Sequence, residues 1–210
     1  MLLKELYGRL FGRRPPIADL ASLADFIDAQ SAFLVQKGIY EYSRARAGHY
    51  SKVLFGEPQF REAVETSRWR AYPLGLAMVG ELVEGVLRPQ NQDRQRVEQQ
   101  PLKRLVLAVF DRYPLPAGIG ADAWREARDE LAGRLDRIGL HPVKPAMDIP
   151  EQFAKSYFAL MPIHKSLRGS DFPTLHSYLK ITMCNIHDEL KKRADIEALR
   201  ADLGAGDGRA

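Results

Sequence analysis

The sequence predicts an all-α protein, an irregular bundle of about six to eight helices. Two observations favour this fold class. Nearly every long segment repeats its apolar residues at intervals of three and four, the spacing of a helix that buries one face. No segment alternates apolar and polar residues as a half-buried strand would. The 210 residues, 45% apolar and 28% charged, are enough to bury a substantial core.

The first half of the chain contains three predicted helices. Residues 2–12 form a short amphipathic piece that ends before Pro15-Pro16. Asp19 can cap the second helix, which extends to about residue 47. A third helix begins near Pro58 and ends at Pro89. We expect Pro73 to kink it, because proline lacks the N–H that the helix needs.

The second half begins with an exposed polar loop, "RPQNQDRQRVEQQP", and continues with a short apolar helix, "LKRLVLAVFDRY". Asp122 is expected to cap the next helix and Gly139 to end it. Two more substantial helices follow, at 151–167 and 171–193, the second capped by Ser170 and Asp171. The predicted organisation is an amphipathic segment at 1–14, one all-α domain at 15–194 and a flexible tail at 195–210.

The helix at 171–193 contains the only cysteine and two of the five histidines. Five of its apolar residues share one face and predict a buried stripe: Leu175, Leu179, Met183, Ile186 and Leu190. His176 and His187 are eleven residues apart, about 16 Å along the axis, so one metal ion cannot bind both. Cys184 and His187 could touch, but we interpret them as boundary residues of a structural helix without metal.

Motifs for cofactor binding and catalysis are missing. Ser170 follows a glycine but lacks the second glycine and the strand of a nucleophile elbow. "GIGADA" at 118–123 lacks the strand of a dinucleotide site, and no P-loop, H-E-x-x-H or paired C-x-x-C occurs. The sequence therefore predicts no catalytic residue, no metal and no cofactor.

The N-terminal segment is the predicted contact site. Its apolar side and its cations resemble a short helix that lies in a membrane interface or on a partner protein. Packing on its own core or on a second subunit, in a homo-oligomer, is the alternative. The predicted contact residues are Leu3, Lys4, Leu6, Tyr7, Arg9, Leu10, Arg13 and Arg14.

Charge and composition limit the partners and the compartment. The net charge is +4 and the pI about 9.2, which suits an anionic membrane surface. No aromatic stacking platform or reading element predicts nucleic-acid binding. A single cysteine excludes an internal disulfide. No apolar segment is long enough for a signal peptide or for a helix that spans a membrane. We expect a cytoplasmic protein, with peripheral contact at the inner membrane as a further option.

Two stretches resemble a known family. "FLVQKGIYEYSRARAG" and "MDIPEQFAKSYFALMPIHKSLRGSDFPTLHSYLKITMCNIHDELKKR" are similar to small alphaproteobacterial helical proteins of uncharacterised function, sometimes labelled "esterase". The resemblance covers Phe33 to Arg193, implies a helical fold and carries over no catalytic motif. In size, basic balance and helical character the chain also resembles the assembly chaperones of the bc1 complex.

The leading hypothesis is therefore a non-enzymatic helical adaptor or assembly protein with a protein partner. It rests on the missing catalytic motifs and on the basic amphipathic N-terminal segment. The alternative is an esterase-like hydrolase whose site is assembled from helix ends.

Overall fold

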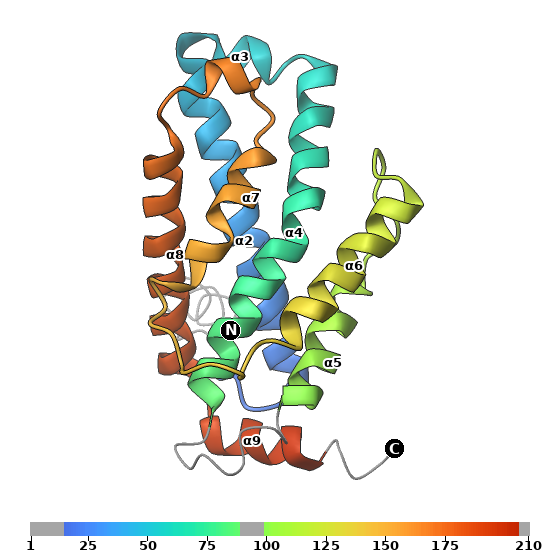
Figure 1. Cartoon of the computed structure of the whole chain (residues 1–210), viewed down its shortest axis with the longest axis vertical. Coiled ribbons are helices and arrows are strands. Elements are labelled where there is room, and N and C mark those ends of the chain that lie inside the picture. Colours follow the sequence, from blue (N-terminus) through green and yellow to red (C-terminus); the bar gives the residue numbers. More distant parts are fainter. Residues whose placement is uncertain (1–14, 89–98, 206–210) are drawn as a thin grey trace, which may run out of the picture.

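The computed structural model describes residues 15–88 and 99–205, and within these ranges the chain is an all-α bundle, as predicted (Figure 1). Short 3-10 turns occur at Gly48–Tyr50 (η1), Ile149–Gln152 (η3) and Lys165–Leu167 (η4). The α-helices are α2 (Leu20–Ala47), α3 (Ser51–Leu54), α4 (Pro58–Leu87), α5 (Gln99–Phe110), α6 (Ala121–Leu135), α7 (Ala154–Ala159), α8 (Phe172–Arg193) and α9 (Ile196–Ala205).

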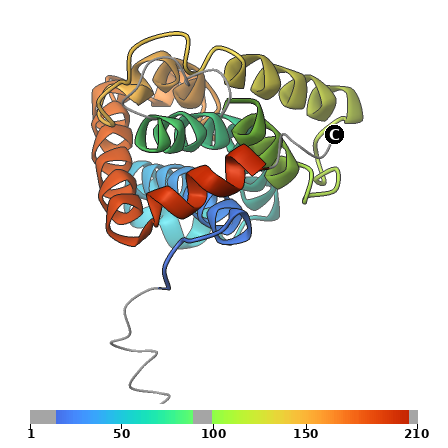
Figure 2. The same cartoon turned by 90° about the horizontal axis from the view of Figure 1, so that it is seen from below.

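Helix α4 lies in the middle of the bundle, with α2, α8 and the α5–α6 pair around it (Figure 2). Every residue from 71 to 84 is buried, which is the pattern of a helix enclosed on all sides. Gly75 allows α2 to approach closely. A Cβ at this position would lie 2.8 Å from Cγ2 of Val35 and 3.0 Å from the carbonyl oxygen of Ser31.

Pro73 lies within α4, and the helix continues beyond it to Leu87. Proline leaves the carbonyl of Trp69 without its usual intrahelical donor. The upper half of α4 follows the long axis of the molecule in Figure 1, and the lower half slants across it, consistent with the predicted kink.

Local signals placed two helices correctly. The Asp19 carboxylate accepts the backbone N–H of Ser22 at 2.7 Å, so Asp19 caps α2 as predicted. Hydrogen bonds from Ser22 lower the pKa of Asp19. On α8 the whole predicted stripe is buried. Leu175 is 3% exposed and Leu179 is 0% exposed.

Two predicted N-caps are corrected. Helix α6 begins at Ala121 after Gly120, and Asp122 lies in its first turn and pairs with Arg125. Asp171 does precede α8, but its side chain caps nothing. Its carboxylate instead accepts the Tyr42 hydroxyl at 3.0 Å and pairs with Arg46 at 3.1 Å. Side chains of α2 therefore bind the carboxylate that would otherwise accept a backbone N–H at the start of α8.

The predicted helix at 151–167 is also wrong, since only the turn η3 and the six residues of α7 are regular before η4. Arg168 gives the physical reason. Its buried guanidinium donates to the carbonyls of Phe158, Met161 and Ile163 at 2.6–2.7 Å. These carbonyls are satisfied by a side chain, so the segment folds as a compact turn around it.

The flexible tail predicted for 195–210 is wrong for Ile196–Ala205, which form α9 across the lower end of the bundle (Figure 1). Leu199 and Leu203 are buried there. Before α9, Ile17 and the chain around Ala194 exchange two backbone hydrogen bonds of 2.9 Å. Residues 206–210 lie outside the described residues.

No helix within the described ranges is long and apolar enough to cross a membrane.

Candidate functional site

All eight predicted contact residues, from Leu3 to Arg14, lie outside the described residues. Their role in membrane or partner contact stays a prediction.

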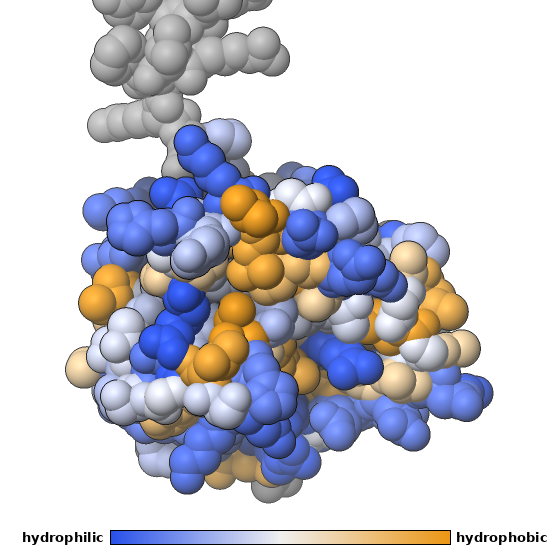
Figure 3. Space-filling model, turned by 90° about the horizontal axis from the view of Figure 1, so that it is seen from above, coloured by the Kyte–Doolittle hydropathy of each residue, from blue (hydrophilic) through white to orange (hydrophobic). Residues whose placement is uncertain are grey.

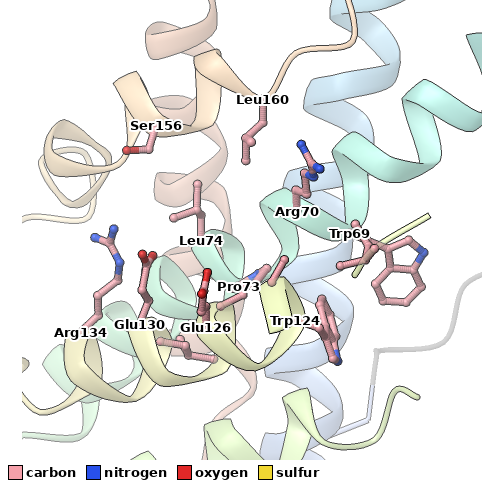
Figure 4. Close-up of a pocket in the computed structure, with 14 residues that line it drawn as sticks. Trp69, Arg70, Pro73, Leu74, Trp124, Glu126, Glu130, Arg134, Ser156 and Leu160 are labelled. Carbon is pink, nitrogen blue, oxygen red and sulfur yellow. The ribbon is translucent and has the colours of Figure 1, made fainter. Parts of the chain in front are cut away.

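A groove of about 430 Å³ opens between α4, α6 and α7 (Figure 4). Leu74 of α4 and Leu160, just after α7, contribute apolar surface, and the buried Leu131 of α6 lies at the floor. Trp69 and Trp124 stand together at one end of the groove in Figure 4. Apolar lining with large aromatic residues is typical of binding sites.

The groove exists because α6 does not pack along its whole length on α4. Only Leu131 and Leu135 of α6 are buried, both near its C-terminal end. Nearer the N-terminal end, Trp124 stacks on Phe110 of α5, with ring centroids 4.3 Å apart. Helix α6 therefore diverges from α4 toward its N-terminus, as Figure 1 shows.

Charged side chains of both signs line the groove. Arg70 comes from α4, and Glu126, Glu130 and Arg134 follow one another at intervals of four along α6. Arg134 lies over the ring of Phe153, 5.3 Å from its centroid. Within the described part of the chain, Arg70, Glu126 and Glu130 form no ion pair with one another. Glu126 and Glu130 carry the same charge and are four residues apart on α6, an arrangement that destabilises a helix by about 0.2–0.5 kcal/mol.

Trp69 is held in place by a tyrosine pair behind it. Its ring meets those of Tyr72 and Tyr113 edge-on, at 5.9 and 5.2 Å. Both hydroxyls donate to the carboxylate of Asp28, at 2.7 and 2.9 Å. Burial, and then Asp28, raise the pKa of Tyr72 and of Tyr113. Both phenols therefore remain hydrogen-bond donors at neutral pH, and the wall of the groove is fixed.

A second polar cluster surrounds Glu81, which is 5% exposed. Its carboxylate accepts Lys144 Nζ at 2.7 Å and Gln152 Nε2 at 2.9 Å, and His141 Nε2 lies 3.5 Å away. Cavities of about 200 and 150 Å³ flank Glu81. This carboxylate–imidazole pair could move a proton, but neither cavity is lined by a serine, threonine or cysteine.

The histidine and cysteine residues of α8 do not converge. Cys184 is a half-buried free thiol, and His187 lines the cavity of about 200 Å³. His176 stacks on Phe172 and lies 3.3 Å from Glu151. The described residues contain no group of three potential metal ligands. Cys184 and His187 are both half-buried, as predicted for the packing boundary of α8.

The remaining serine candidate is also isolated. Ser170 is exposed beside Gly169, and His164 is engaged locally, with Nδ1 at 2.8 Å from the hydroxyl of Ser166.

Sequence reasoning missed the groove. One signal was available: the segment that forms α6 offers few apolar positions apart from Trp124, Leu131 and Leu135. A helix with so narrow an apolar stripe cannot be enclosed, and this predicts an open side next to it.

No protein-family model matches the chain, and no curated protein or solved structure shows significant similarity to it. The resemblance to alphaproteobacterial helical proteins stays a prediction.

Proposed function

We propose that the protein is a non-enzymatic helical adaptor or assembly protein, which binds a segment of a partner protein in the groove between α4, α6 and α7. We propose that it acts in the cytoplasm, at or near the inner membrane. One observation carries it: a fixed tryptophan pair and an apolar floor occur beside charges of both signs that do not pair with one another.

The dimensions of the groove favour a peptide segment. Its lining on α6 extends from Ala123 to Arg134, about 16 Å or three helical turns. An amphipathic helix binds such a surface through apolar residues spaced by three and four. Tryptophan and arginine are the residues that most often dominate binding energy at protein interfaces. Trp69, Trp124, Arg70 and Arg134 all border this groove.

The charges specify the partner further. Glu126 and Glu130 favour lysine or arginine on the partner, and Arg70 favours an acidic residue. The inferred partner segment therefore has an apolar face flanked by both signs of charge.

The hydrolase alternative has less support. An esterase-like hydrolase of the serine or cysteine type needs a nucleophilic side chain beside a base. Among the three cavities described above, Ser156 is the only hydroxyl side chain, and no histidine lines its groove. His141 lies in a different cavity.

Reversing one charge of the groove tests the proposal. Glu130→Lys should weaken co-purification of the partner from cells of the source organism by about thirtyfold, because like charges then meet across the interface at a cost of about 2 kcal/mol. Asp129→Lys is the matched control, since Asp129 is exposed on the same helix but does not line the groove. Equal co-purification with both variants would refute the groove as the binding site.

A further inference from the structure

One end of the bundle, at the top of Figure 1, is formed by two connections far apart in the sequence. The first contains η1 and α3, between α2 and α4, and the second contains η4, before α8. The contacts of Asp171 with Tyr42 and Arg46 join the end of α2 to the start of α8. We name residues 44–56 and 161–170 together the tip.

The tip exposes large apolar side chains on a fixed base. Tyr50 is 76% exposed, Val53 64% and Leu167 60%. Below them Phe55 packs against Tyr40 and Phe60, with ring centroids 5.3 and 5.1 Å apart. Figure 3, which views this end from above, shows hydrophobic surface interspersed with hydrophilic side chains.

The charge of the tip has one sign. Residues 42–56 and 152–170 contain no aspartate and no glutamate. Arg44, Lys52 and Lys165 are exposed and form no ion pair with the residues that the structure describes. Two acidic residues border the tip: Asp171, which is paired with Arg46, and the exposed Glu57 before α4.

We infer that the tip docks on an anionic lipid bilayer, and that Tyr50, Val53 and Leu167 enter the headgroup region. Cations around a small apolar protrusion are the combination that binds a membrane interface, and tyrosine is enriched at that depth. Each lysine or arginine near an anionic surface adds attraction. The tip forms one end of the long axis of the molecule, so it can meet a flat, deformable lipid surface without hindrance from the rest of the bundle. Docked by the tip, the molecule would keep the groove on its side open to a partner.

The inference is independent of residues 1–14 and of the proposed function of the groove. Its test uses the full-length chain and two kinds of vesicle, phosphatidylcholine alone and an equimolar mixture of phosphatidylcholine with phosphatidylglycerol. We expect sedimentation with the mixed vesicles only. Lys52→Gln and Lys165→Gln should each weaken this binding about fivefold. Val53→Ser should weaken it in both low and moderate salt, because the apolar contribution is not screened.

Matched controls come from surfaces outside the tip. Lys192→Gln, an exposed cation near the C-terminal end of α8, and Ile181→Ser, an apolar residue of α8 that is 63% exposed, should bind vesicles as the unchanged protein does. The inference is overturned if the tip variants bind like these controls, which would assign any vesicle binding to other residues such as 1–14. Binding of the same variants to a polyribonucleotide is measured in parallel. If the tip variants lose binding to the polyribonucleotide but bind vesicles as before, the inference is also overturned, and the tip would be assigned to nucleic acid.

Discussion

Replacing Arg88 with methionine should lower the free energy of unfolding by about 3–5 kcal/mol, since it leaves a buried carboxylate without its cation. Arg88 Nε and Nη2 donate to the two carboxylate oxygens of Glu84 at 2.8 and 2.7 Å. The two side chains are only 7% and 9% exposed. Arg88 Nη1 also donates to the carbonyl of His141 at 2.8 Å, so the same change releases the connection after α6.

Two further variants separate this explanation from a general loss of packing. The double variant Glu84→Leu with Arg88→Met should recover most of the lost stability, because no buried charge is left unpaired. Arg68→Met removes a more exposed partner of Glu65 and should cost less than about 1 kcal/mol. Urea midpoints of the variants measure the differences. If Arg88→Met lowered the free energy of unfolding as little as Arg68→Met does, the explanation would be wrong, because the Glu84 carboxylate would then have to be hydrated.

Leu179→Ala should destabilise the protein by about 2–5 kcal/mol, because Leu179 is 0% exposed and its removal leaves a cavity in the core. Cys184→Ala should cost much less, since the thiol is half-buried and little volume is lost. Ile181→Ala, on the outer face of the same helix, should change stability by no more than about 0.5 kcal/mol. Denaturant unfolding of the three variants provides this comparison.

Metal analysis of the purified protein completes this test of α8. We expect no stoichiometric zinc. Bound zinc that both Cys184→Ala and His187→Ala release would contradict the structural interpretation of α8 and make the helix part of a metal site.

Local patterns predicted the helices whose determinants lie within their own sequence. Asp19 and Ser22 are neighbours, so the start of α2 could be predicted without knowledge of the fold. The stripe of α8 is likewise a property of one helix, and its burial follows from the spacing of Leu175, Leu179 and Met183.

The errors arose where distant residues compete with local ones. The Asp171 carboxylate is engaged by Tyr42 and Arg46, which are more than a hundred residues away. Helix α9 is stabilised by the bundle end that it covers, and Arg200 donates to the carbonyls of Leu87, the last residue of α4, and of Arg88 at 2.8 and 3.0 Å. Neither contact could be deduced from a local pattern of apolar residues.

The groove depends even more on tertiary structure. Its residues come from α4, α6, α7 and the connections beside them, and it is open because α6 is buried only near its C-terminal end, while Trp124 near the other end contacts both Phe110 of α5 and Trp69 of α4. The sequence shows the tryptophans and the charges, but it does not show which helix each will contact. For the same reason the two acid-free stretches of the tip could be seen in the sequence, whereas their proximity could not.

Site-specific photo-crosslinking in cells tests most directly whether the groove binds a partner protein. A photoreactive residue at Ala127, which lines the groove, is compared with one at Asp129 on the outer side of the same helix. We expect the Ala127 probe to yield one covalent adduct, mapped to a single segment whose apolar residues have helical spacing, and Asp129 to yield none. Absence of an adduct at Ala127, or the same adducts from both positions, would contradict the proposal that this groove binds a partner.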